Sequence, residues 1–111
     1  MYALIFSKAI DLDFDQCKKY IEETLEAPKA AEKLFNELYG KINGILENPF
    51  RRPLVQDKYL ASLGIRSINI KNYMLFYTIT EETNTVNAVR FMYSKRDWIN
   101  ILKDKALEEL F

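Results

Sequence analysis

Apolar side chains in the first half of the sequence recur mainly at helical spacing. Tyr2 to Phe6 is a short apolar and aromatic run, which predicts a buried strand. A helix is predicted next, with Asp11 or Asp13 as its N-cap and with one apolar stripe that packs against the rest of the protein. The stripe comprises Phe14, Cys17, Ile21 and Leu25.

A second helix is predicted from Pro28 to Asn48-Pro49, because proline is tolerated in the first turn of a helix and stops the helix before it. Its apolar positions give the cleanest helical period in the chain. They are Ala31, Leu34, Phe35, Leu38, Ile42 and Ile45. The tight link between the two helices predicts an antiparallel hairpin whose apolar stripes face a common sheet. Residues 48–63 are predicted to form a long loop.

The second half of the chain has the composition of strands. Three segments are rich in β-branched and aromatic residues, and polar turns at Asn72 and at residues 81–84 separate them. They are Ile65 to Lys71, Tyr73 to Thr80 and Thr85 to Tyr93. These segments predict a three-stranded antiparallel meander, with the N-terminal strand joining one edge. The expected fold class is therefore α+β, with a four-stranded twisted sheet.

Lys95 to Phe111 predicts a C-terminal helix whose apolar surface is wider than one helix face requires. Its apolar positions are Trp98, Ile99, Ile101, Leu102, Ala106, Leu107, Leu110 and Phe111. We expect a protein partner to contact this surface through Trp98, Ile101 and Leu102.

Composition restricts the possible functions. The length of 111 residues predicts one domain, residues 1–111, that needs neither disulfides nor a structural metal. Cys17 is the only cysteine, and there is no signal peptide and no apolar run near ~18 residues, so we expect a cytoplasmic protein that does not enter membranes. The absence of His removes the usual general base and most zinc sites. We expect no metal and no cofactor.

The formal net charge of zero conceals an asymmetry along the chain. Residues 1–47 carry 6 basic and 9 acidic side chains, whereas residues 48–97 carry 8 basic and 4 acidic ones. The middle segment can therefore attract phosphate locally, but a neutral protein is expected to bind free RNA or DNA weakly.

The order of elements, together with the segments GIRSINIKNYMLFYTI and VRFMYSKRDW, resembles the RelE/ParE superfamily of toxins from type II toxin–antitoxin systems. The similarity covers nearly the whole chain and includes Pro28 to Ala31, Asn48-Pro49 and Arg96-Asp97. It implies a toxin that a cognate antitoxin protein neutralises, and that reaches operator DNA only through this antitoxin. RelE-like members cleave mRNA in the ribosomal A site, whereas ParE-like members poison DNA gyrase.

Metal-independent cleavage of mRNA needs a base, an acid for the leaving oxygen and cations for the charge that develops on phosphorus. The resemblance implies Arg66 as a catalytic arginine that grips the scissile phosphate and Arg90 as a second one. Tyr93, at the end of the last predicted strand, is expected to act as acid or to stack on a base. Further contacts with the substrate are expected from Arg51, Arg52, Lys71 and Arg96.

Each of these residues also has a structural interpretation, and the target stays open. Arg66 and Arg90 are also placed to pair with Glu81, Glu82 or Asp97 on the sheet surface. Strong mRNA-cleaving members are typically basic, so a neutral chain without His also fits a ParE-like gyrase inhibitor, or an attenuated toxin that mainly binds its antitoxin and represses its operator. We favour the ribonuclease here, because two arginines and a tyrosine together fit the mRNA-cleaving site better.

Overall fold

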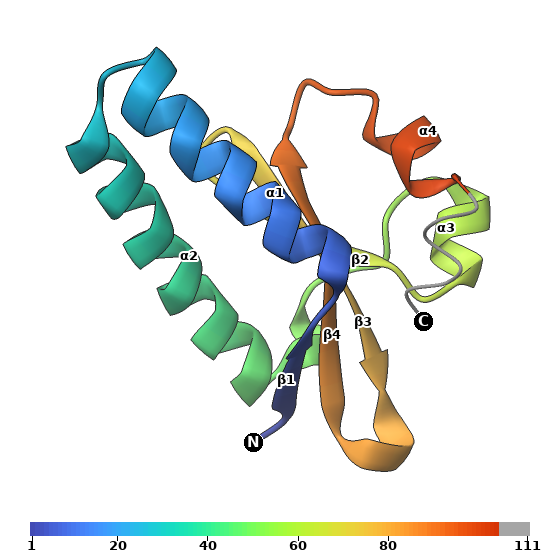
Figure 1. The fold of residues 1–111 in the computed structure, drawn as a ribbon. Helices are drawn as coiled ribbons and strands as arrows, with labels where there is room; N and C mark the ends of the chain where they lie inside the picture. Colours follow the sequence, from blue (N-terminus) through green and yellow to red (C-terminus); the bar gives the residue numbers. More distant parts are fainter. Residues whose placement is uncertain (105–111) are drawn as a thin grey trace.

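The computed structural model describes residues 1–104, and the apolar positions predicted at residues 106, 107, 110 and 111 lie outside them (Figure 1). The elements are β1 (Ala3–Phe6), α1 (Lys8–Lys19), α2 (Pro28–Glu47), α3 (Lys58–Ser62), β2 (Arg66–Ile70), β3 (Tyr73–Thr80), β4 (Thr85–Tyr93) and α4 (Trp98–Leu102). A π-helical segment, η1 (Tyr20–Thr24), continues α1, and 3-10 turns cover Pro49–Arg51 (η2) and Glu81–Thr83 (η3).

The four strands form one sheet in the order β1-β4-β3-β2. Strands β2, β3 and β4 are antiparallel neighbours, and β1 pairs in parallel with β4, so the meander and the edge position of the N-terminal strand are confirmed. The prediction that this strand is buried is wrong, because Ile5 is 57% and Phe6 40% exposed. An edge strand has a neighbour on one side only, so part of its apolar surface faces solvent.

Helix α1 begins earlier than its apolar stripe suggested. Ser7 is its N-cap, and the Ser7 Oγ accepts a hydrogen bond from the Ile10 backbone N at 3.0 Å. The prediction of Asp11 or Asp13 as the cap is therefore wrong. The earlier start places Asp13 inside the helix, in phase with the buried Ile10 and Cys17, where its side chain turns toward the protein interior.

The end of the first helix widens into the π-helical segment η1. The Leu25 backbone N donates to the Tyr20 carbonyl five residues earlier at 3.1 Å, which is the bond of a π turn. The wider turn rotates Leu25 away from the stripe that it was predicted to join, and its side chain is 54% exposed. By contrast, α2 begins at Pro28 and ends at Glu47, and the positions predicted for its buried stripe pack into the core.

Helical layers cover both faces of the sheet (Figure 1). The α1–α2 hairpin packs on one face, where the core includes Ile68, Leu75 and Phe91 of the strands. On the opposite face, Phe76 and Met92 pack with residues of α3, of α4 and of the loop that precedes α3. Helix α3 lies inside the segment predicted as loop, because five residues are too few for an apolar period to be visible in the sequence. Among the described residues, no helix combines the length and the apolar character needed to cross a bilayer.

Candidate functional site

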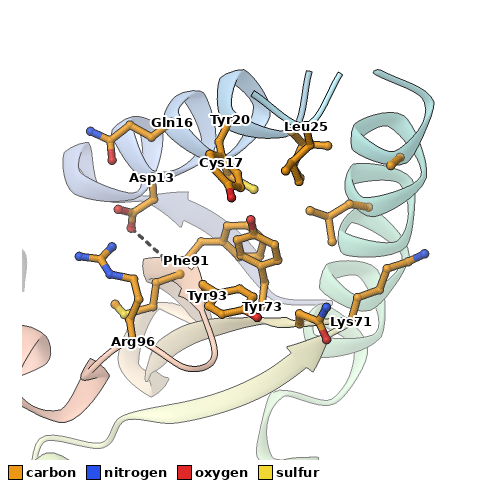
Figure 2. A pocket seen from close by; sticks show the side chains of 15 residues that line it. Asp13, Gln16, Cys17, Tyr20, Leu25, Lys71, Tyr73, Phe91, Tyr93 and Arg96 are labelled. Atoms are coloured by element: carbon orange, nitrogen blue, oxygen red, sulfur yellow. Dashed lines mark hydrogen bonds between the residues drawn. The ribbon is translucent and has the colours of Figure 1, made fainter. Parts of the chain in front are cut away.

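A pocket of about 800 Å³ lies where the helical hairpin meets one end of the sheet (Figure 2). Its walls come from α1, η1, α2, the turn between β2 and β3, and the end of β4. The lining side chains include Asp13, Gln16, Cys17, Tyr20, Ile21, Leu25, Leu34, Lys71, Tyr73, Phe91, Tyr93 and Arg96. Its volume lies in the range of protein sites that hold a small molecule or a large anchoring side chain.

Aromatic rings and a thiol fix one wall of the pocket. The ring of Tyr73 stacks on Phe91 with the centroids 5.1 Å apart, and Tyr93 meets it edge-on at 5.7 Å. Cys17 is 7% exposed and lies close enough to the Tyr73 phenol to interact with it. Burial raises the pKa of Tyr73 well above its usual value, and burial likewise raises the pKa of the Cys17 thiol. Both groups are therefore neutral at pH 7 and are unsuited to act as a base.

Three of the predicted substrate or catalytic residues line the pocket, and Figure 2 shows Lys71 and Arg96 on opposite sides of it with Tyr93 between them. Lys71 lies in the β2–β3 turn with φ 54°, Tyr93 ends β4 with 38% of its surface exposed, and Arg96 follows in the next turn. Neither Lys71 nor Arg96 forms an ion pair with any residue that the structure describes. The pocket therefore has an apolar wall and two uncompensated positive charges at its rim.

Arg90 has a different environment from the other predicted cations. Its Nε donates to Asp13 Oδ2 at 2.7 Å and its Nη2 donates to Asp13 Oδ1 at 2.9 Å. A β-bulge explains the geometry, because Phe76 is opposite Arg90 while Tyr77 is opposite Ala88, which leaves Val89 as the extra residue. The bulge directs Arg90 toward α1. Arg90 therefore pairs with Asp13 and not with Glu81, Glu82 or Asp97, which were the expected partners.

Arg66 lies opposite the middle of β3, whereas Tyr93 lies at one end of the sheet. It begins β2 opposite Tyr77, whereas Tyr93 is opposite Tyr73, so their backbones are separated by roughly 10 Å across the strands and roughly 13 Å along them. The Arg66 guanidinium donates to the carbonyl of Arg52 and lies 5.3 Å from the centre of the Phe50 ring. The three residues predicted as catalytic are therefore dispersed over the sheet, and the Arg90 guanidinium is held by Asp13.

The residues predicted to contact a partner pack on this chain's own sheet. The Trp98 ring lies 5.2 Å from that of Phe76, Ile101 is half-buried, and Leu102 is 1% exposed. A salt bridge of 3.0 Å between Lys103 Nζ and Asp57 Oδ2 joins the end of α4 to α3. Leu102 therefore has no free surface while α4 is docked, and partner contact through Trp98 and Ile101 stays a prediction.

The sequence matches the family model of the ParE toxin of the type II toxin–antitoxin system parDE over residues 4–98. The chain belongs to this ParE toxin family. It is therefore a toxin of a type II toxin–antitoxin module, within the wider RelE/ParE superfamily. No curated protein sequence matches the chain significantly.

Solved structures of related toxins share the fold of this ParE-family toxin. A chain of the chromosomal ParDE system from P. aeruginosa aligns with a TM-score of 0.66 and 12% identity, over 86% of this chain and 98% of that one. A chain of the intact RelBE complex from E. coli aligns with a TM-score of 0.59 and 17% identity, over 86% of this chain and 100% of that one. The isolated E. coli RelE toxin gives 0.58 and 16% over 100% of both chains. At these identities the likeness establishes the fold but not the target.

Proposed function

We propose that this toxin arrests growth by binding a protein, with DNA gyrase as the target that the resemblance to ParE implies. The observation that carries this proposal is the dispersion of Arg66, Arg90 and Tyr93. Asp13 compensates the charge of Arg90, and the backbones of the other two residues are two strands and four residues apart on the sheet. Cleavage of RNA needs cations and proton donors at one phosphate, since misplacement by even about 1 Å is costly in catalysis.

Coverage of the sheet also favours a protein-binding mode. The face opposite the helical hairpin is buried beneath α3 and α4, so Phe76 and Met92 are at most 2% exposed. An RNA strand thus has no open sheet face on which to lie. The pocket, in contrast, has exposed tyrosine and leucine side chains at its mouth, Tyr20 at 50% and Leu25 at 54%. Aromatic and apolar anchors beside arginine are typical of protein interfaces.

A type II toxin has a second protein partner, its cognate antitoxin. We infer that the antitoxin prevents growth arrest by covering a surface that the target needs, and that operator DNA is reached only through this antitoxin. We predict that Trp98 and Ile101, on the half-buried side of α4, contact the antitoxin.

An assay with purified components tests the target. We expect the toxin to inhibit supercoiling of relaxed plasmid by gyrase and to leave mRNA 5′ ends unchanged after induction in bacteria. Addition of the antitoxin encoded beside the toxin should restore supercoiling. Codon-specific mRNA cuts that depend on translation, with gyrase fully active, would contradict the proposal.

One observation favours ribosome-dependent mRNA cleavage as a second candidate. Lys71, Tyr93 and Arg96 border a single pocket, which therefore has two cations and a phenol in its lining that an RNA phosphate would contact. If this activity is present, Tyr93→Phe should abolish cleavage. The fold should stay unchanged, because the Tyr93 ring is at the surface and its hydroxyl forms no hydrogen bond with the residues that the structure describes. If the toxin instead acts on gyrase, Tyr93→Phe should leave the inhibition of gyrase intact. The variant therefore separates the two functions.

A further inference from the structure

Three arginines gather where β2 begins, away from the pocket at the other end of that strand. Arg51 and Arg52 are exposed at the end of η2, and Arg66 begins β2 beside them. The Arg66 guanidinium donates to the Arg52 carbonyl, which ties the strand to the loop. Both Arg66 and Arg52 are close enough to Tyr77 to act on its phenol electrostatically. We call Arg51, Arg52, Arg66 and the neighbouring Phe50 the arginine surface.

Buried groups hold the arginine surface in place. The Tyr77 hydroxyl donates to the Pro49 carbonyl at 2.8 Å, and the Tyr77 side chain is fully buried. This bond fixes the loop that carries Arg51 and Arg52 against β3. The Phe50 ring packs edge-on against Tyr2 at 6.5 Å and supports the Arg66 guanidinium on its face. The Arg66 guanidinium and the backbone of the loop that carries the other two arginines are therefore held in place before any ligand binds.

No carboxylate compensates these three charges within the described part of the chain. None of the three arginines takes part in an ion pair there, in contrast to Arg90 with Asp13 and Lys103 with Asp57. The nearest carboxylate in sequence is Glu47 at the end of α2, and it is exposed and pairs with none of them. An uncompensated cluster of this kind creates a local positive field on a protein whose net charge is zero.

Guanidinium groups match phosphate oxygens through paired N–H donors, and an exposed aromatic ring provides a face for a sugar or base. Phe50 is 44% exposed beside the arginines. We propose that the arginine surface binds the phosphodiester backbone of a nucleic acid that the toxin's target presents. This extends the proposed function, because gyrase holds DNA, but binding itself is measurable without any target. The surface acts as an auxiliary contact, since three phosphate contacts on a neutral protein give weak, salt-dependent binding.

Fluorescence anisotropy of the purified toxin tests this proposal. The probes are a labelled DNA duplex of about 20 base pairs and a labelled single-stranded RNA of similar length, at about 50 mM salt and above. The test variant is Arg51→Glu/Arg52→Glu. The matched control is Lys18→Glu/Lys19→Glu, which makes the same change of net charge at an exposed pair on α1. The relative affinities for the two probes show whether the surface prefers the DNA that gyrase holds or single-stranded RNA.

We expect the arginine variant to bind at least about tenfold more weakly than the control and to lose about two units of the slope of log affinity against log salt. Arg66→Lys, which keeps the charge but not the fork of donors, should also weaken binding. Equal losses in both double variants, or no binding by the wild type at low salt, would overturn the proposal. So would displacement of the probe by poly-glutamate of equal charge, which would indicate an acidic protein ligand.

The same variants separate this proposal from the proposed function. Weaker inhibition of gyrase by Arg51→Glu/Arg52→Glu than by the lysine control supports a role of the surface at the target. Loss of nucleic-acid binding with unchanged gyrase inhibition overturns that role and leaves the proposed function intact. Absence of gyrase inhibition by the wild type overturns the proposed function alone.

Discussion

Arg90 and Asp13, which lie 77 residues apart, form a two-point ion pair that joins the bulge of β4 to the middle of α1. Asp13 Oδ2 also accepts a hydrogen bond from the Phe91 backbone N at 2.9 Å. The side chains are 20% and 7% exposed, so the pair is largely removed from water. The arginine to which the resemblance to RelE-like toxins gives a catalytic role thus has a structural partner, which accepts hydrogen bonds from its Nε and Nη2.

Removal of either partner should destabilise the protein, because the remaining charge is left partly buried without compensation. We expect Arg90→Ala and Asp13→Ala each to lower the free energy of unfolding by about 2–4 kcal/mol, less than for a fully buried pair because Arg90 keeps some contact with water. Urea denaturation measures the change. Arg51→Ala, an exposed arginine without an ion pair among the described residues, is the control and should stay within about 0.5 kcal/mol.

This prediction also limits what Arg90 variants reveal about activity. A loss of growth arrest in Arg90→Ala is expected from instability alone, so it does not identify a catalytic arginine. If Arg90→Ala were as stable as Arg51→Ala and yet inactive, the structural role argued here would be wrong, and phosphate contact would be the better explanation.

The buried hydroxyl of Tyr77 provides a second test of how the arginine surface is positioned. Tyr77→Phe removes the donor to the Pro49 carbonyl and leaves a buried acceptor unpaired. We expect a loss of about 1–2 kcal/mol in the free energy of unfolding, together with faster amide hydrogen exchange in the loop around Arg51. Tyr39→Phe, at an exposed position of α2, is the control. Unchanged exchange in the loop would show that the bond does not hold it.

The parts of the fold that sequence predicted best are those with a long, uniform period. Helix α2 carries an unbroken helical period, and strands β3 and β4 are rich in β-branched and aromatic residues and are bounded by clear turn residues, so even their ends were predicted correctly. Helix α3 is too short to show a period, and the π turn at Leu25 changes the phase by one residue, which no local pattern encodes. The cap was missed because Ser7 follows β1 immediately.

In the candidate site, too, the local sequence pattern predicts which residues are buried, whereas the contacts between distant segments depend on how the elements pack. Asp13 is in phase with Ile10 and Cys17, and this phase could have identified it as a buried carboxylate that needs a cation. That the cation is Arg90 depends on the packing of α1 against β4 and on the bulge at Val89, neither of which is local. The distance between Arg66 and Tyr93 was implicit in the predicted strands, since Arg66 lies near the start of the first strand of the meander and Tyr93 ends the third.

Exposed apolar residues at the mouth of the pocket give a prediction about protein partners. Leu25 lines the pocket and is 54% exposed, so Leu25→Lys should change the free energy of unfolding by no more than about 0.5 kcal/mol. If the pocket receives a partner, affinity for that partner should fall by about tenfold or more. Leu12→Lys is the matched control, because Leu12 lies on α1, is 62% exposed and does not line the pocket.

Calorimetry of both variants with the antitoxin and with gyrase decides which partner uses the pocket. Loss of affinity for gyrase alone identifies the pocket as the target site. Loss for both partners indicates that the antitoxin neutralises the toxin by direct competition. Equal affinities of Leu25→Lys and Leu12→Lys for both partners would exclude the pocket from either interface.

Stability at alkaline pH should report on the wall of the pocket. Burial raises the pKa of Cys17, of Tyr73 and of Tyr77 in the folded protein. Above the ordinary values, about 8.5 for cysteine and about 10 for tyrosine, the unfolded chain therefore binds fewer protons than the folded one. The free energy of unfolding must then fall as pH rises, whereas below these values the contribution is fully present.

We expect denaturation midpoints in urea to decline from about pH 8 to about pH 10.5, and Tyr73→Phe to make this decline shallower because one of the groups that ionise only on unfolding has been removed. Cys17→Ala should act in the same direction at the lower end of that range. Tyr39→Phe should keep the steep decline of the wild type. A Tyr73→Phe variant with the wild-type pH dependence would mean that the Tyr73 phenol is hydrated in solution, and that the pocket wall is more open than its stacking on Phe91 indicates.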